Sequence, residues 1–277
     1  MMMKFSILIA QYNNGQYFKE CFDSIVSQSY TDWEVIIVDD SSTDDSVAVI
    51  KDIILGDDRF KLYENEVNKG CGYTKGRCMD FASGEICGYL DPDDALYPEA
   101  LEKSVKAYQK NPEIVATYSR MMMCNENMIP DKTFSQTKKV DNNPYFFNCP
   151  VQFAHFFTFK KAIYDKTQGI NPQLSSAVDQ DLYLKILDHG DPAFIDEDLY
   201  KYRLHSQGIS QFKSKSKAKE SFAKVIFDTI NRRNIKTINQ VEVPKKYSNS
   251  EEIFDLLMYQ TKWYYRLRTK AKLFFKS

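Results

Sequence analysis

Short apolar runs alternate with stretches of helical periodicity through the first 110 residues of this chain. The runs cover residues 5–10, 33–38, 60–63 and 86–90, and each is typical of a buried strand. Between them apolar side chains recur every three or four residues, as at Phe18, Cys21 and Ile25. Strands that alternate with helices over short links indicate βαβ units. We therefore predict an α/β fold, and 277 residues can bury its core without a disulfide or a metal.

The charge balance and the cysteines exclude several classes of protein. With 37 basic and 38 acidic residues the net charge is −1, which argues against a nucleic-acid partner, and 43% hydrophobic residues argue against disorder. No pair among the six cysteines has C-x-x-C spacing, and no Cys/His cluster has the spacing of a zinc site. We see no signal peptide and no run of 18 apolar residues. We therefore expect a cytoplasmic protein with free thiols.

Acidic residues follow two of the predicted strands at the point where each strand ends. Asp39 and Asp40 come after the second run, and Asp91, Asp93 and Asp94 come after the fourth. In open parallel sheets, ligands bind beyond the carboxyl ends of the strands. Carboxylates this close repel one another unless a cation lies between them, and Mg²⁺ and Mn²⁺ bridge carboxylates to phosphates. The cluster predicts a metal–diphosphate site; the alternative is that Asp94 caps the next helix and the others are solvated turn residues.

Two further local signals lie near these strand ends. Ser42 and Asp45 have the spacing of a capping box for the helix that follows. Gly70, Gly72 and Gly76 would let a backbone approach a ligand closely. They match neither the dinucleotide-binding G-x-G-x-x-G pattern nor the phosphate-binding G-x-x-x-x-G-K-[ST] pattern. The glycines therefore favour neither of those two nucleotide sites.

Four segments, taken in order, resemble the family 2 glycosyltransferases, which have the GT-A fold. They read SILIAQYNNGQYFKECFDSIVSQSYTDWEVIIVDDSSTDDS, NKGCGYTKGRCMDFASGEICGYLDPDD, AVDQDLYLKILDHG and YRLHSQGIS. The resemblance covers residues 4–210 and implies a GT-A-type Rossmann-like sandwich with a mostly parallel central sheet, plus a C-terminal helical extension. It implies a catalytic domain over 1–210, with a nucleotide-sugar-binding half at 1–110 and an acceptor-binding half at 111–210. The helical extension would then occupy 211–277.

The resemblance also implies roles for individual residues. The donor nucleotide sugar would be bound by Ala10, Tyr12, Asn13, Asp39, Asp40, Asn68, Arg77, Asp91 and Arg203. A divalent cation, Mn²⁺ or Mg²⁺, would be held by Asp93, Asp91, Asp94 and His205. Asp179 would be the catalytic base. Asp181 is its rival, although an acid in the first turn of a helix is also favoured by the helix dipole alone.

The implied reaction is an inverting transfer of a sugar from a nucleoside diphosphate sugar, by family habit a UDP sugar. The acceptor would be a hydroxyl of a glycan or lipid-linked saccharide in surface polysaccharide biosynthesis. The cation neutralises the departing diphosphate, and the base takes the proton of the acceptor hydroxyl. A sugar nucleotidyltransferase is one alternative, but it needs a Gly-rich, Arg-containing loop where this chain has AQYNNGQY. A non-catalytic nucleotide-sugar or glycan-binding module is another, and missing acidic residues would favour it.

The acceptor-binding half has less regular patterns. Residues 114–118 predict a strand, and the polar, Met-rich stretch 121–140 predicts a mobile loop over the site. Six phenylalanines crowd residues 146–159 around His155. They fit either a packed strand face or an aromatic wall for the acceptor. A single histidine in such a setting is more often a hydrogen-bonded core residue than a ligand.

The C-terminal residues are basic and amphipathic. A helix is predicted over 250–275. One face of it carries Trp263, Leu267, Ala271 and Phe274. Residues 261–277 include six Lys or Arg and no acid, which favours peripheral association with an anionic surface at the inner face of the cell membrane. The alternative is that the apolar face packs on the catalytic domain or on the partner in a homodimer.

Overall fold

The computed structural model describes residues 3–205 and 215–275. The strands of this part are β1 (Phe5–Gln11), β2 (Trp33–Asp39), β3 (Phe60–Glu64), β4 (Ile86–Tyr89), β5 (Ala95–Leu96), β6 (Ala116–Cys124), β7 (Pro130–Thr133), β8 (Phe157–Lys160), β9 (Pro192–Arg203), β10 (Thr237–Ile238) and β11 (Val241–Glu242). The helices are η1 (Gly15–Tyr17), α1 (Phe18–Val26), α2 (Ser46–Ile53), α3 (Cys71–Phe81), α4 (Ala100–Lys110), α5 (Lys161–Tyr164), α6 (Val178–Leu187), α7 (Lys215–Arg232), α8 (Ser250–Leu257), η2 (Met258–Thr261) and α9 (Trp263–Phe275).

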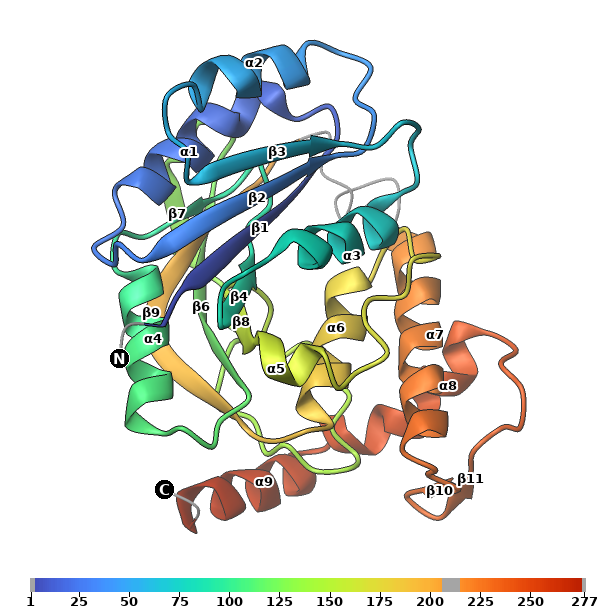
Figure 1. The fold of residues 1–277 in the computed structure, drawn as a ribbon. Coiled ribbons are helices and arrows are strands. Elements are labelled where there is room, and N and C mark those ends of the chain that lie inside the picture. The colour runs from blue at the N-terminus through green and yellow to red at the C-terminus, as the bar shows by residue number, and fades with distance from the viewer. Residues whose placement is uncertain (1–2, 206–214, 276–277) are drawn as a thin grey trace.

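The main sheet has the strand order β3-β2-β1-β4-β8-β6-β9-β5, and β7 pairs with β6 (Figure 1). The strands β1 to β4 pair in parallel, as the alternating pattern predicted. The remaining half is mixed, because β8 runs antiparallel to both β4 and β6, while β6 and β9 are parallel. The carboxyl ends of β1, β2 and β4 therefore lie at one edge, and the predicted acidic turns follow two of them.

Helices cover both faces of the sheet and give two separate cores. One core joins alternate residues of β1 and β2, such as Ile7 and Val35, to α1, α2 and α4. The other joins the alternate set, such as Leu8 and Ile36, to α3 and α6. Strands buried on both faces read as continuous apolar runs, which is why their positions were predictable.

A third core ties the C-terminal helices to the rest of the chain. Phe147 is fully buried among apolar residues of α7 and α8, including Ile226, Ile230 and Ile253. Phe147 lies in the predicted acceptor-binding half, before β8. The C-terminal helices are thus packed around a side chain from the segment before β8.

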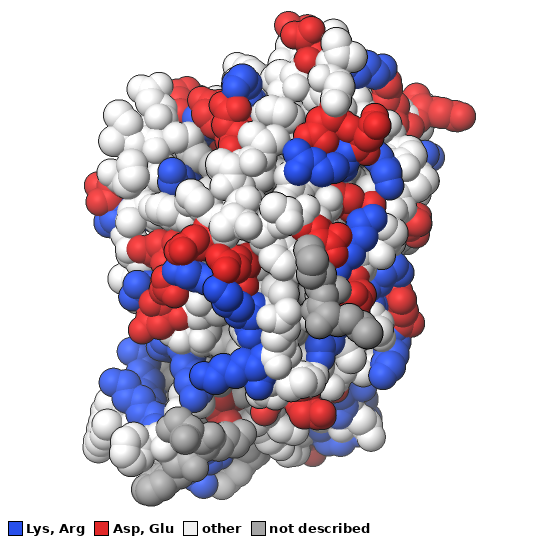
Figure 2. Space-filling model, turned by 60° about the vertical axis from the view of Figure 1, so that its left-hand side comes forward, with Lys and Arg blue, Asp and Glu red and all other residues white. Residues whose placement is uncertain are grey.

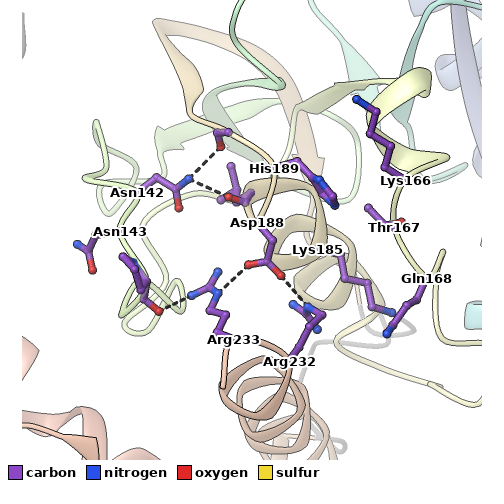
Figure 3. Close-up of a pocket in the computed structure, with 13 residues that line it drawn as sticks. Asn142, Asn143, Lys166, Thr167, Gln168, Lys185, Asp188, His189, Arg232 and Arg233 are labelled. Atoms are coloured by element: carbon purple, nitrogen blue, oxygen red, sulfur yellow. Dashed lines mark hydrogen bonds and ion pairs between the residues drawn. The ribbon is translucent and has the colours of Figure 1, made fainter. Parts of the chain in front are cut away.

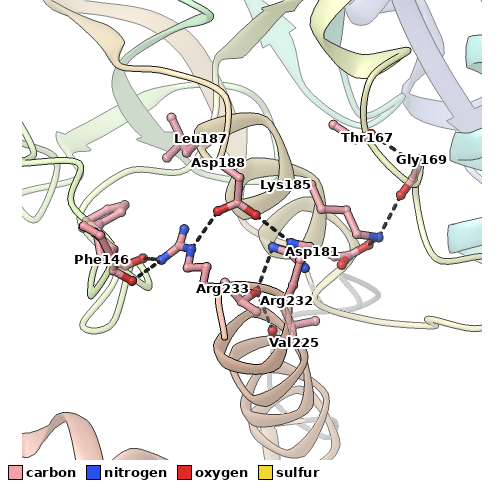
Figure 4. A network of polar contacts seen from close by, with 12 residues as sticks. Phe146, Thr167, Gly169, Asp181, Lys185, Leu187, Asp188, Val225, Arg232 and Arg233 are labelled. Atoms are coloured by element: carbon pink, nitrogen blue, oxygen red, sulfur yellow. Dashed lines mark hydrogen bonds and ion pairs between the residues drawn. The ribbon is translucent and has the colours of Figure 1, made fainter. Parts of the chain in front are cut away.

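A carboxylate just after α6 also holds the end of α7. Asp188 accepts hydrogen bonds from Nε of Arg232 at 2.6 Å and from Nε of Arg233 at 2.7 Å. Arg233 further donates to the main-chain carbonyl of Phe146 at 2.6 Å (Figure 4). These groups border a cavity of about 660 Å³. Figure 3 shows Asp188 between the two arginines in this cavity. We call this arrangement of Asp188, Arg232 and Arg233 the arginine clamp.

Three local predictions were wrong. The helix α2 begins at Ser46, so Ser42 and Asp45 form no capping box; the Ser42 side chain binds Asp39 instead, at 2.6 Å. Residues 121–140 are not one loop, because β6 continues to Cys124 and β7 follows at 130–133. The helix predicted over 250–275 is divided into α8, η2 and α9.

Other predictions fared better. All six cysteines are free thiols. The six phenylalanines near His155 are all buried, but they do not form one face: Phe156 lies in the first core, Phe147 in the third, and the other four in the second. Residues 206–210 of the last family-like segment, and the proposed boundary at 210, lie outside the described residues.

Candidate active site

A cavity of about 630 Å³ lies at the carboxyl edge of the parallel strands. Its lining comes from β1 and the loop after it, the first turns of α3, the turn after β4, β6, the segment before β8, the start of α6 and the residues just before it, β9, and the C-terminal helices α7 and α8. Of the predicted site residues, it brings together Ala10, Asp91, Asp93, Asp94 and Asp179. We call this space the active-site cavity.

The three carboxylates after β4 point to different partners. Oδ1 of Asp91 lies 3.3 Å from Nζ of Lys75. Oδ2 of Asp93 lies 2.8 Å from Nε2 of His205, at the end of β9. Burial raises the pKa of Asp93, the charge of Asp91 raises it further, and the bond to His205 opposes the rise. Asp91 and Asp93 therefore face the cavity, each with a partner of its own.

Asp94 is held by the protein itself. Its carboxylate accepts the hydroxyl of Tyr200 at 2.7 Å and the main-chain N–H of Arg203 at 2.7 Å. Burial raises its pKa well above the ordinary value, and the neighbouring acids add to the rise. These contacts fasten β9 to the turn after β4. The geometry gives Asp94 a structural role, and its role as a metal ligand stays a prediction.

Arg203 also departs from expectation. It was expected near a bound diphosphate, but its guanidinium is buried and donates to two main-chain carbonyls, of Asp93 at 2.6 Å and of Glu126 at 2.5 Å. The guanidinium lies 4.7 Å from the ring centroid of Tyr17. Arg203 thus stiffens the acidic turn from behind.

The pair of Asp93 and His205 fits a divalent cation as a partial ligand set. A carboxylate and an imidazole are both donors that Mn²⁺ accepts. Nδ1 of His205 is buried without a hydrogen-bond partner among the described residues. Within 3–205 and 215–275, no group of three or more His, Cys, Asp or Glu side chains is arranged to hold a metal. The oxygens of a bound diphosphate would have to complete the coordination.

Lys75 joins the acidic turn to the start of α6. Its ammonium lies 2.7 Å from Oδ1 of Asp179, besides its contact with Asp91. Burial would lower the pKa of Lys75, but the two carboxylates outweigh it and raise the pKa. Gly72 makes this approach possible, because a Cβ there would lie 2.4 Å from the carbonyl oxygen of Asn171. The helix α3 therefore packs close to the segment before α6.

The two candidate bases at the start of α6 have different surroundings. Asp179 borders the active-site cavity. Burial raises its pKa, but Lys75 and then His155 outweigh burial, so the pKa is lowered. Asp181 lies in a buried ion pair with Lys185 at 2.7 Å and also accepts the N–H of Asn171. Asp181 therefore fixes local structure, and only Asp179 is available to a ligand.

The first two acidic residues organise loops. Asp39 accepts both the N–H and the hydroxyl of Ser42, at 2.8 and 2.6 Å. Asp40 accepts the amide of Asn65 and the main-chain N–H groups of residues 69 and 70, at 2.7 to 2.8 Å. Gly70 has φ of +86°, a conformation that favours glycine. Together these bonds set the path from β3 into α3.

The other predicted nucleotide residues lie outside the lining of the cavity. Asn13 exchanges hydrogen bonds with Thr43, which joins the loops after β1 and β2. Tyr12 and Asn68 are exposed. Arg77 donates to the carbonyl of Glu64 and lies over the ring of Phe81, at 5.5 Å. Among the residues expected to bind the nucleotide sugar, Ala10 and Asp91 border the cavity.

The profile described as Glycosyl transferase family 2 matches residues 6–167. The chain belongs to this family. Among curated relatives, chondroitin synthase of Escherichia coli is 30% identical over 235 residues, which are 83% of this chain and 33% of that protein. Hyaluronan synthase of Pasteurella multocida is 29% identical over 254 residues, 90% of this chain and 25% of that protein. The chain thus spans a third or less of the length of these relatives.

Solved structures of glycosyltransferases share the fold. TarS 1–349 of Staphylococcus aureus in complex with UDP-GlcNAc matches with a TM-score of 0.67 at 20% identity, over 92% of this chain and 70% of that one. The mannosyltransferase PcManGT from Pyrobaculum calidifontis, in complex with GDP-Man and Mn²⁺, matches at 0.61 and 14% identity, over 93% and 69%. The predicted GT-A fold is confirmed.

In this family 2 glycosyltransferase, sequence reasoning missed two residues of the cavity. On α3 the residue predicted to bind the donor was Arg77, but the side chain that contacts the carboxylates of the cavity is that of Lys75. The signal was present: Lys75 falls on one stripe of the helix with half-buried Cys71 and buried Cys78 and Met79, where a lysine needs a partner. The second is His155.

His155 was expected in the core, and it borders the active-site cavity instead. Its ring stacks on that of Tyr200, with centroids 4.9 Å apart, and Nε2 lies 3.8 Å from Oδ2 of Asp91. No local pattern indicates this, because its position depends on β9 and on the turn after β4.

Proposed function

We propose that this chain is an inverting glycosyltransferase that moves a sugar from a nucleoside diphosphate sugar to a saccharide hydroxyl. The observation that carries the proposal is the placement of Asp179 in one cavity with Asp91 and Asp93. A carboxylate in this position can accept the proton of the attacking hydroxyl. The absence of a Gly-rich, Arg-containing loop after β1 disfavours a sugar nucleotidyltransferase. The presence of the acidic turn and of the candidate base Asp179 disfavours a non-catalytic binding module.

The residues of the cavity divide the work of such a transfer. Asp93 and His205, with Asp91 on the same turn, would hold a Mn²⁺ or Mg²⁺ ion. When bound, that ion stabilises the charge on the departing diphosphate. Lys75 places a second positive charge beside Asp91 and keeps Asp179 ionised. One base facing the acceptor suffices for inversion, since no covalent intermediate has to form.

A UDP sugar is the donor we propose. Support comes from TarS, whose structure contains UDP-GlcNAc on the same fold. A second relative is named UDP-Glc:alpha-D-GlcNAc-diphosphoundecaprenol beta-1,3-glucosyltransferase WfgD, of Escherichia coli, and is 30% identical over 146 residues, 53% of this chain. That name describes a lipid-linked acceptor. We therefore propose a lipid-linked or polymeric saccharide acceptor, a role in surface polysaccharide synthesis, and a catalytic unit over 1–210 with 211–277 as extension.

A thermal-shift screen tests the donor and the metal together. The chain is heated with UDP-GlcNAc, UDP-GalNAc, UDP-glucose and UDP-glucuronate, each with and without Mn²⁺. We expect at least one UDP sugar to raise Tm by several degrees only when Mn²⁺ is present. Asp93→Ala should abolish the shift, and the exposed control Asp131→Ala should keep it. A chain that no UDP sugar stabilises contradicts the proposed donor.

We also propose that α9 rests on an anionic membrane surface at the inner face of the cell membrane. The helix packs inward through half-buried Tyr265, Thr269 and Leu273. Its other side exposes Trp263 at 73%, Leu267 at 56% and Phe274 at 77%, so most of this apolar surface is open to solvent. The helix α9 lies at the lower end of the molecule in Figure 1, and Figure 2 shows Lys and Arg side chains gathered at this end.

The charges on α9 suit such a surface. They are Arg266, Arg268, Lys270 and Lys272, and Lys262 lies just before the helix. Each cation near an anionic bilayer contributes about 1 kcal/mol to binding, and exposed aromatics add apolar contact. Among the described residues, no helix is long and apolar enough to cross a bilayer. The proposal is therefore one of association at the surface.

A further inference from the structure

The helices α7 and α8 form one wall of the active-site cavity. Phe222 and Lys219 of α7 and Phe254 of α8 line it. The two phenylalanine rings lie 6.1 Å apart between centroids, tilted by 58°. Nζ of Lys219 lies 5.6 Å from the centroid of the Phe254 ring. Both phenylalanines are half-buried, so ring surface is available to a ligand in the cavity.

This wall is held in a fixed place relative to Asp179. Figure 1 shows α7 lying between α6 and α8, and it packs against both. The arginine clamp fixes the end of α7 to Asp188, which follows α6. The third core fixes its middle around Phe147. The early turns of α7, with Phe222, therefore stay beside the first turn of α6, with Asp179.

The chemistry of inversion assigns the two ends of the cavity. The acceptor hydroxyl attacks from the side opposite the departing diphosphate. If Asp91, Asp93 and His205 mark the diphosphate end, the acceptor must enter beyond Asp179, away from them. The wall of Phe222 and Phe254 borders the same cavity and comes from elements outside the nucleotide-binding half.

We infer that the Phe222–Phe254 wall binds a pyranose ring of the acceptor saccharide. This rests on the proposed function, because it assumes that Asp179 faces the acceptor. The apolar C–H face of a pyranose packs against the electron-rich face of an aromatic ring. The wall is thus an acceptor subsite built by the C-terminal extension.

The charges at the wall are balanced. Lys219 forms an ion pair with Glu251 at 2.8 Å, on the rim where both side chains are about half exposed or more. A carboxylate on the acceptor is therefore not required for binding here. The ring face supplies the contact, and the ammonium of Lys219 remains able to donate to a sugar hydroxyl.

Saccharide binding can be measured without any donor. Saturation-transfer NMR is recorded with the methyl β-pyranosides of glucose, galactose, N-acetylglucosamine, N-acetylgalactosamine and glucuronic acid. We expect at least one to receive saturation from the protein. Phe222→Leu and Phe254→Leu keep apolar volume but remove the ring face, and each should weaken that binding roughly fivefold. Phe227→Leu is the matched control, because Phe227 is buried on α7 outside the cavity.

Two results would overturn the inference. One is that no pyranoside binds; the other is that Phe227→Leu weakens binding as much as the wall variants do, which would indicate a packing effect. Circular dichroism of each variant establishes that the extension is folded. Failure of the UDP-sugar screen would contradict the proposed function separately, since saccharide binding is measured with no nucleotide present.

Discussion

The ammonium of Lys75 lies 2.7 Å from the carboxylate of Asp179, although 104 residues separate them in the sequence. The pair joins α3 to the start of α6. It also keeps the proposed base ionised, because the ammonium outweighs the burial that would otherwise raise the pKa of Asp179. A base held in this way is ready to accept a proton at neutral pH.

Replacing Lys75 should change the pH dependence of transfer. The pKa of Asp179 is lowered, so the wild type should lose activity only as pH falls below the ordinary range of an aspartate, near 3.9. In Lys75→Met, burial is no longer outweighed by the ammonium, and the acid limb of kcat should move to higher pH. The measurement is kcat against pH at saturating donor, with Lys106→Met of an exposed ion pair as control. An acid limb that stays in place would contradict this role of Lys75.

Asp179→Asn should lower the rate of transfer, whereas Asp181→Asn should lower the stability of the fold. Asp179→Asn removes the proton acceptor and should reduce kcat by about 10²–10⁴-fold, with UDP affinity by calorimetry nearly unchanged. Asp181→Asn removes the only carboxylate paired with buried Lys185 among the described residues and leaves its bond to the carbonyl of Gly169, so the free energy of unfolding in urea should fall by about 3 kcal/mol. Near-normal turnover in Asp179→Asn would show that the base lies elsewhere.

Glu34 on β2 should make stability depend on acid pH. Burial raises its pKa, but bonds from the N–H of Ser83, the hydroxyl of Ser6 and the ammonium of Lys4 outweigh it and lower the pKa to about 2. A carboxylate with a depressed pKa contributes fully above its unfolded value of 4.5, and the contribution is lost as pH falls toward 2. The free energy of unfolding should drop by about 3 kcal/mol across that window.

Urea unfolding at a series of pH values from about 5 down to about 2 measures this loss. Glu34→Gln should be less stable at the upper end and lack this part of the slope. Glu113→Gln, at an exposed site, is the control and should follow the wild type. A slope equal in Glu34→Gln and the wild type would assign the acid sensitivity to other carboxylates.

The exposed face of α9 should determine binding to anionic liposomes. Removing residues 261–277, or combining Trp263→Ser with Phe274→Ser, should release the chain from phosphatidylglycerol vesicles in a flotation assay. Leu55→Ser is the matched control, because Leu55 is 83% exposed but lies after α2. Raising the salt concentration should weaken binding of the wild type. Flotation that the truncation leaves unchanged would contradict the membrane proposal.

Much of the fold followed from local patterns in the sequence. The strands β1, β2 and β4 are buried on both faces, so their apolar runs were visible without knowledge of their partners. The continuation of β6 past Tyr118 was missed, since the methionines 121–123 show no alternation and β6 pairs there with a distant strand, β9. Helical spacing in 250–275 likewise could not reveal where η2 interrupts it.

The sequence indicated where the site residues lie along the chain better than it indicated which side chains they contact. The acidic turn after β4 and Asp179 were found because each lies at an element end where motifs can be recognised. The contacts that separate Asp93 from Asp94, or Lys75 from Arg77, depend on β9 and α6, far away in the chain. Side-chain partners of that kind are set by tertiary packing, which residue spacing does not encode.

The burial of Phe147 among α7 and α8 affects how segments of this chain can be exchanged with those of other family members. In a chimera that took only the residues after 210 from a relative, the relative's helices would have to pack against Phe147 and Asp188 of this chain. An exchange meant to alter acceptor choice would therefore have to carry the segment around Phe147 and the residue after α6 along with the helices. If the Phe222–Phe254 wall binds the acceptor as we propose, the residues that determine acceptor choice are discontinuous in the sequence.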